Sequence, residues 1–144
     1  MMLARGLVQE PEILLLDEPT SNLDIRHQLD VTKMLKRLSV ERGILIVMIS
    51  HDINIAAKFA DQVILMFQGK IYDVGTPAEV ITEENLRTVY GVTSRIVDDD
   101  GRPHVILEDA LPMTEACNPS AVMASIRERR AAEARASEDG KGRA

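Results

Sequence analysis

The sequence predicts an α/β fold with a mainly parallel sheet at its core, followed by small antiparallel hairpins. Aliphatic runs typical of buried strands occupy residues 13–16, 44–49 and 63–67, with segments of helical character between them. This alternation of strands and helices is typical of parallel sheets with crossover helices. After residue 67 the pattern changes to short strands joined by tight turns, which indicates hairpins.

The two leading strands have purely aliphatic runs. A helical piece is expected at 1–9, and the breaker "EPE" separates it from "ILLL" at 13–16. The run "ILIVMI" at 44–49 is similar. Since neither run alternates with polar residues, we expect both strands to be buried on both faces.

Capping residues mark the expected helices. Asp24 ends the loop "PTSNLD" and is suited to cap a helix that runs to about Arg42, with Gly43 as its stop. Asp52 is suited to cap a short helix over 53–60.

The sequence pattern of the second half of the chain predicts two hairpins and two small helices. "QGK" turns the strand at 63–67 into "IYDV", and "DDGR" turns a second hairpin over 95–109. Between them, "TPAE" at 76–79 forms a capping box, and a small helix is expected over 82–91. From about residue 112 apolar residues thin out, so 112–144 is expected to be a polar tail, either solvated or helical.

Composition excludes several classes of function. The net charge of −6 argues against a general nucleic-acid or anionic-membrane surface, and aromatic residues make up only 3%. Cys117 is the single cysteine and fits a reducing cytoplasm. No apolar run approaches the roughly 20 residues of a spanning helix. A membrane connection is therefore expected only through a partner.

Polar residues follow the first two strands at the point where each ends. Asp17 and Glu18 follow the first, and Ser50 and His51 follow the second. Ligands bind beyond the carboxyl ends of parallel strands, so these side chains are expected to share one crevice. A single acid there is usually a cap, but two adjacent acids at an apolar strand end fit a divalent cation better. Asp17 is suited to hold Mg²⁺ and Glu18 to polarise a water.

Three segments carry a family resemblance. "ILLLDEPTSNLD" at 13–24 closely resembles the Walker B and D-loop segment of ABC-type ATPases, and "SHD" at 50–52 resembles their switch-histidine loop. The residues before position 13 resemble the helix that follows the signature sequence. The resemblance covers about residues 1–110. It implies that 1–111 is the C-terminal portion of an ABC ATPase domain, of the P-loop NTPase class, and that 112–144 is a separate tail.

The resemblance also implies ATP and Mg²⁺ as cofactors, with a role for each residue. Asp17 resembles the Mg²⁺-associated acid, Glu18 the general base, and His51 the residue that contacts the γ-phosphate. The loop that reaches across to the nucleotide on a second domain contains Ser21, Asn22 and Asp24. Simpler readings stay open: a capping acid for Glu18, a structural histidine for His51, and helix capping as an additional role for Asp24. His27 and His104 are expected to be surface residues.

Two motifs of that family are absent from the printed sequence. It contains no G-x-x-x-x-G-K-[ST] loop, since Lys70 lacks the upstream glycine, and no LSGGQ-type signature. We therefore expect a truncated gene product or a partial gene model, or a chain that pairs with another carrying the missing half. Because phosphoryl transfer depends on positioning of the phosphates, the chain alone is expected to be inactive.

The segment 68–92, "QGKIYDVGTPAEVITEENLRTVYGV", resembles ATPase subunits of importers for iron-siderophore complexes, haem and cobalamin. That resemblance implies membrane permease subunits, a second ATPase subunit in a dimer and, indirectly, a substrate-binding protein as partners, with no nucleic acid. It also implies a peripheral position at the cytoplasmic face of the cell membrane. A non-transport ABC ATPase fragment and a non-catalytic interaction fragment remain as alternatives, although sustained heptads are lacking.

Overall fold

The computed structural model describes residues 11–112, together with Ala124 and Glu128. The helix expected at 1–9, Cys117 and nearly all of the tail 112–144 lie outside these residues, so those expectations stay untested. The chain divides into two compact units with the boundary between Asp61 and Gln62. Each unit is described by itself.

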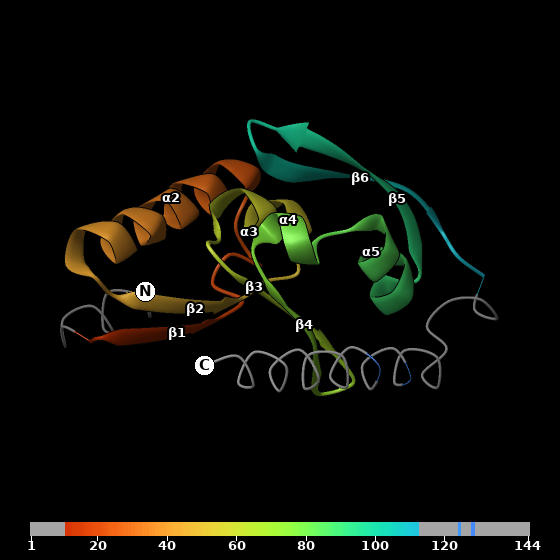
Figure 1. The fold of residues 1–144 in the computed structure, drawn as a ribbon. Helices are drawn as coiled ribbons and strands as arrows, with labels where there is room; N and C mark the ends of the chain where they lie inside the picture. The colour runs from red at the N-terminus through yellow and green to blue at the C-terminus, as the bar shows by residue number, and fades with distance from the viewer. Residues whose placement is uncertain (1–10, 113–123, 125–127, 129–144) are drawn as a thin grey trace. The chain divides into compact units, whose positions relative to one another are not determined.

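The first unit has the order β1 (Ile13–Asp17), α2 (Ile25–Arg42), β2 (Leu45–Ile49) and α3 (Ile53–Phe59). The strands β1 and β2 pair in parallel, in register from Ile13 opposite Leu45 to Asp17 opposite Ile49. Helix α2 connects them and lies along one face of the pair (Figure 1). The predicted strand–helix–strand order with parallel pairing is confirmed here.

The helix ends of this unit follow the capping residues. The Asp24 carboxylate accepts a hydrogen bond from the backbone N–H of His27 at 2.9 Å, and Gly43 ends α2 in the left-handed conformation at φ 65°. The Asp52 carboxylate accepts from the N–H of Ile55 at 2.9 Å and caps α3. These positions match the predicted boundaries to within one residue.

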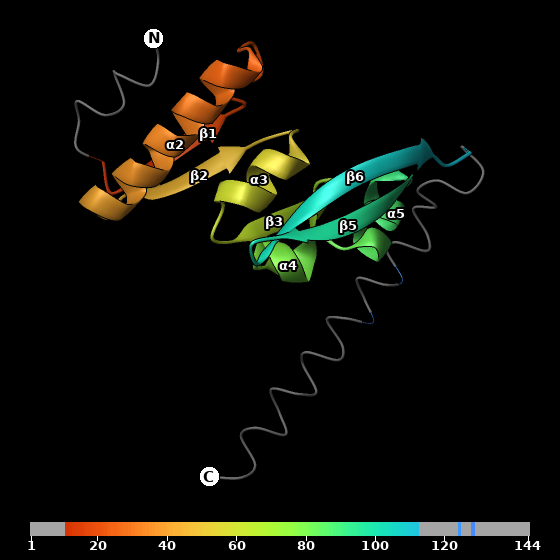
Figure 2. The ribbon, with the colours of Figure 1, turned by 90° about the horizontal axis from the view of Figure 1, so that it is seen from above.

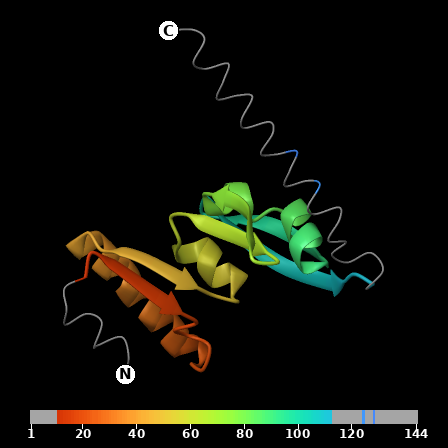
Figure 3. The ribbon, with the colours of Figure 1, turned by 90° about the horizontal axis from the view of Figure 1, so that it is seen from below.

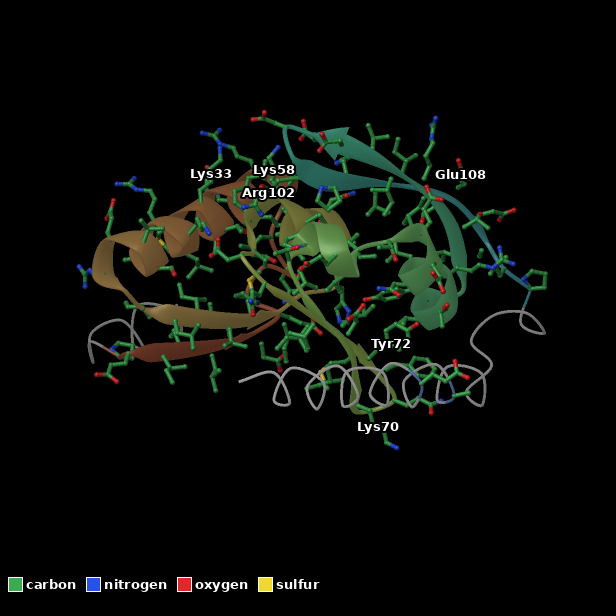
Figure 4. The ribbon with its side chains drawn as sticks, viewed as in Figure 1. Lys33, Lys58, Lys70, Tyr72, Arg102 and Glu108 are labelled. Carbon is green, nitrogen blue, oxygen red and sulfur yellow. The ribbon has the colours of Figure 1, made fainter. Side chains whose placement is uncertain are left out.

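Helix α2 and one face of the β1–β2 sheet form the core of the first unit. Leu14, Leu35 and Ile44 are buried there. Partly buried side chains complete the cluster: Leu16, Val31, Ile46 and Met48. Seen from above, α2 runs over the sheet (Figure 2), and Lys33 extends from the side of α2 that faces away from it (Figure 4).

The other face of the β1–β2 sheet is open among the described residues, as the view from below shows (Figure 3). It exposes alternate residues of both strands: Ile13, Leu15, Leu45, Val47 and Ile49. We call these five residues the open sheet face. The expectation that both strands are buried on both faces is therefore wrong for this chain. Successive strand residues point to opposite faces, and the single helical layer of α2 covers only one of them.

The second unit comprises β3 (Val63–Phe67), β4 (Lys70–Gly75), α4 (Pro77–Val80), α5 (Glu83–Tyr90), β5 (Val92–Asp99) and β6 (Arg102–Ala110). Both predicted hairpins are confirmed, because β3 pairs with β4 and β5 with β6 in antiparallel fashion. Each turn has two central residues with positive φ: Gln68 and Gly69, and Asp100 and Gly101. That geometry matches the twist of hairpin strands.

Strand β3 differs from the expected third parallel strand. Among the described residues it pairs only with β4. The two-residue turn brings β4 beside β3 at little entropic cost. The parallel part of the described sheets is thus the β1–β2 pair alone.

The second unit packs its helices against the first hairpin. Its core contains Leu65, Val80, Val89 and Tyr72, the last of which is labelled in Figure 4. The predicted capping box is present, since Thr76 and Glu79 bond reciprocally at the start of α4. None of the helices within residues 11–112 has the length and hydropathy that a membrane span needs.

Candidate functional site

The ends of β1 and β2 bring two of the predicted site residues together. The backbone N–H of Glu18 donates to the carbonyl of Ile49 at 3.1 Å, which continues the parallel ladder one residue beyond β1. The chain then leaves both strands at the same edge, with Glu18 on one segment and His51 on the other. Their side chains meet there, with 2.6 Å between Glu18 Oε1 and His51 Nε2.

The Glu18–His51 pair lies near the surface. Their side chains are 40% and 81% exposed, so solvent screens the pair and its contribution to folding stability is small. The contact orients both groups instead: a ring N–H at Nε2 donates to a carboxylate that retains its other oxygen for a further partner. An acceptor and an imidazole in contact, both open to solvent, are suited to proton transfer.

Glu18 has an uncommon backbone conformation. Its φ is 44°, one of three positive values at non-glycine residues described in the structure, and the other two lie in hairpin turns. Positive φ costs a residue with a Cβ roughly 1–2 kcal/mol. Such strain clusters at functional sites, where the surrounding structure imposes it. The sharp change of direction directs the Glu18 side chain toward the end of β2.

This strain predicts a difference between two substitutions that both remove the carboxylate. Glycine adopts a positive φ without steric strain, so Glu18→Gly relieves the strain, whereas Glu18→Ala retains it. We expect the glycine variant to be more stable than the alanine variant by about 1 kcal/mol. Urea denaturation of the two variants at equal concentration measures the difference. Equal midpoints would contradict the assigned strain.

Asp17 directly precedes Glu18 as the last residue of β1. It is in register with Ile49 and exposed, and by strand alternation it belongs to the same side of the sheet as Leu15. The structure records no hydrogen bond or ion pair for its carboxylate. No group of three or more side chains suited to a metal ion occurs within the described residues. An exposed carboxylate nevertheless fits Mg²⁺, which keeps several waters and uses only one or two protein carboxylates.

Hydrogen bonds to backbone carbonyls fix the loop after Glu18. Ser21 donates to the Glu18 carbonyl from its backbone N–H at 3.3 Å and from its hydroxyl at 3.1 Å. At the other end, Gln28 Nε2 donates to the carbonyl of buried Thr20 at 3.1 Å. Asn22 is exposed and has no recorded hydrogen bond. The loop thus has a defined shape and presents Ser21 and Asn22 to solvent.

Asp24 closes this loop and contacts a residue that sequence reasoning left as an ordinary surface histidine. Its Oδ1 accepts from the His27 backbone N–H and lies 2.8 Å from His27 Nδ1. The backbone N–H of His27, and then its ring, hold the pKa of Asp24 below its usual value. The cap is therefore intact above the ordinary carboxyl pKa and is lost only as pH falls through the lowered value. The signal in the sequence was a histidine three residues after a capping aspartate.

An acid–histidine pair beyond two parallel strands, followed by a hydrogen-bonded loop and a capped helix, defines a strand-end site of the kind at which α/β domains bind ligands. Comparison with known proteins narrows this class. No protein-family profile matches the chain. However, it is 44% identical over 106 residues to an uncharacterised ABC transporter ATP-binding protein of Methanocaldococcus jannaschii, covering 74% of this chain and 41% of that protein.

Two further relatives have more specific names. A hemin import ATP-binding protein of Bordetella avium is 46% identical over 88 residues, covering 61% of this chain and 34% of its own length. The ferric enterobactin transport ATP-binding protein of Escherichia coli is 41% identical over 106 residues, covering 72% and 39%. The chain thus spans 34–41% of the length of these three relatives.

Solved structures agree with these relatives. A metal-chelate type ABC transporter in an inward-facing conformation matches in fold, with a TM-score of 0.66 and 24% identity over 74% of this chain and 44% of that one. CbiO1 of Clostridium perfringens, part of the ABC transporter complex CbiONQ, matches with a TM-score of 0.52 and 38% identity over 58% and 34%. The chain is therefore homologous to ABC transporter ATP-binding proteins and has the fold of part of an ABC ATPase domain.

Proposed function

We propose that this chain is part of the ATP-binding and ATP-hydrolysing subunit of an ABC importer, with an iron-siderophore complex, haem or cobalamin as the class of solute. The contact between Glu18 and His51 carries the proposal, because it joins an acceptor and an imidazole beyond two parallel strands. The hemin and ferric enterobactin proteins among the relatives support the solute class.

The residues have separate roles in this proposal. Glu18 accepts a proton from water and aligns that water for in-line attack, while His51 orients Glu18 and contacts the γ-phosphate. Asp17 would hold Mg²⁺ through its exposed carboxylate. Bound Mg²⁺-ATP supplies the phosphoryl group and the cation that neutralises its charge.

The exposed residues of the loop 20–24 and the net charge of the chain support the proposed partners. Ser21, Asn22 and Asp24 are exposed at the loop and suited to contact a second ATPase subunit and its nucleotide. Membrane permease subunits and, indirectly, a substrate-binding protein complete the importer, which places this chain at the cytoplasmic face of the membrane. The net charge of −6 fits a protein partner better than nucleic acid.

The absent phosphate-binding loop gives a direct test. We expect the isolated 144-residue chain to show no measurable ATP hydrolysis and only weak nucleotide binding, because Glu18 has no positioned phosphate to act on. Co-expression with a complementing segment that carries a phosphate-binding loop should restore hydrolysis. Phosphate release and equilibrium dialysis measure the two properties. Hydrolysis by the chain alone that Glu18→Gln abolishes would contradict the assigned dependence on that loop.

The open sheet face favours one alternative, a non-catalytic fragment that docks onto another ATPase chain. Affinity capture from membranes separates the two functions. Recovery of the chain with a two-domain permease and a second ATPase subunit, together with restored hydrolysis, supports the importer. Recovery with an intact ATPase whose activity is unchanged by Glu18→Gln in this chain supports the docking fragment.

A further inference from the structure

We infer that His27 is a positioning residue, whose ring fixes the Asp24 carboxylate and with it the geometry of the loop 20–24. The contact between His27 Nδ1 and Asp24 Oδ1, at 2.8 Å, carries the inference. The relevance of this positioning role to a second ATPase subunit rests on the proposed function. The contact between His27 and Asp24 is independent of that proposal.

Both hydrogen bonds to Asp24 reach the same oxygen. Oδ1 accepts from the His27 backbone N–H at 2.9 Å and faces the ring nitrogen of the same residue. A backbone cap alone fixes the position of one oxygen. The added ring contact also restricts rotation of the carboxylate, so that Oδ2 has a defined direction. No described residue is recorded as a donor to Oδ2, which leaves this oxygen for a partner outside the chain.

The helix beneath the ring is held in place. The Thr32 hydroxyl donates to the Gln28 carbonyl at 2.7 Å, and the Gln28 side chain donates to the Thr20 carbonyl at 3.1 Å. The loop is therefore attached to the first turn of α2 at its start by Gln28 and at its end by Asp24. His27 lies between these attachments and reinforces the second one.

The contact also determines which tautomer the ring adopts. A carboxylate acceptor at Nδ1 requires the proton on Nδ1, whereas a free neutral imidazole in water favours Nε2. Nδ1–H is thus the neutral tautomer that the contact with Asp24 favours.

Solid-state ¹⁵N NMR of the histidine-labelled 144-residue chain tests the contact, and self-association does not interfere with it. The three histidines are assigned by substitution. We expect His27 to be mostly the Nδ1–H tautomer, and to revert to mostly Nε2–H in Asp24→Ser. Serine keeps the helix cap but lacks the carboxylate, so the two roles of Asp24 separate. The same tautomer ratio in both chains would overturn the inference.

A double-mutant cycle in the chain co-expressed with its complementing segment tests the positioning role. Because exposed pairs couple weakly, His27→Ala should lower ATP turnover by about two- to fivefold without changing ATP binding. In the Asp24→Ser background it should have no further effect. Arg37→Ala is the matched control, since it breaks an exposed pair with Glu41 further along α2. Unchanged turnover in His27→Ala, or additive effects, would overturn the role. Absence of hydrolysis in the unmodified assembly would instead count against the proposed function, and the tautomer would still decide the inference.

Discussion

Glu18→Gln is expected to lower ATP turnover by about 10²- to 10⁴-fold in a domain completed by its phosphate-binding half, while ATP binding persists. Glutamine keeps the size of the side chain and can still accept a hydrogen bond from His51 Nε2, so the contact at 2.6 Å is retained in form. The group that accepts the proton from water is lost. The ATP-bound assembly should therefore accumulate.

Asp17→Asn provides the comparison, because no hydrogen bond or ion pair is recorded for the Asp17 carboxylate, whereas Glu18 contacts His51. Removing its charge should weaken the binding of Mg²⁺-ATP itself. Phosphate release and nucleotide binding, measured on both variants across a Mg²⁺ series, separate the two effects. If Glu18→Gln turns over ATP at the unmodified rate, or loses binding as severely as Asp17→Asn, the proposed division of roles is wrong.

The isolated chain is expected to self-associate through the open sheet face. Parallel sheets are normally covered on both faces, and here five large apolar side chains of β1 and β2 are exposed together. Full burial of one such side chain is worth about 1.5–3 kcal/mol, so their combined burial favours association. Unpaired strand edges add to this tendency.

Two lysine substitutions test whether this face is responsible. Leu15 and Val40 are both 73% exposed, but Leu15 lies on the open sheet face and Val40 near the end of α2. Leu15→Lys should shift the chain toward monomer in sedimentation experiments, since the charge cannot be buried unpaired. Val40→Lys should leave the association unchanged. A monodisperse, cooperatively unfolding monomer of the unmodified chain would refute the prediction, as would equal effects of the two lysines.

Local signals were sufficient for most elements. The caps at Asp24 and Asp52, the stop at Gly43 and the capping box at Thr76 act through bonds to residues within three or four positions. The two-residue hairpin turns act over the same range. Because these interactions depend only on neighbouring residues, the sequence pattern contains them fully, and the helices and hairpins predicted within residues 11–112 are confirmed.

The candidate site was less fully predictable. The strand-end rule correctly indicated that Glu18 and His51 would be neighbours, although 33 residues separate them. It also grouped Asp17 with them; Asp17 is the last residue of β1, and its share in the site stays a prediction. The contact between His27 and Asp24 was not predicted, since a histidine near a helix start has several possible partners and only the folded structure shows which one its Nδ1 contacts.

The sequence by itself determined the order of strands and helices, their boundaries and the placement of acids and imidazole at strand ends, because these depend on neighbouring residues and side-chain periodicity. Tertiary structure decided three features that an aliphatic run does not encode. It left one face of β1 and β2 open, paired β3 with β4, and imposed a positive φ on Glu18 that turns it toward His51. Each depends on which surfaces are available to cover or pair with a strand. An apolar run indicates that a strand is favoured in a buried position, but it does not determine which element covers it or pairs with it.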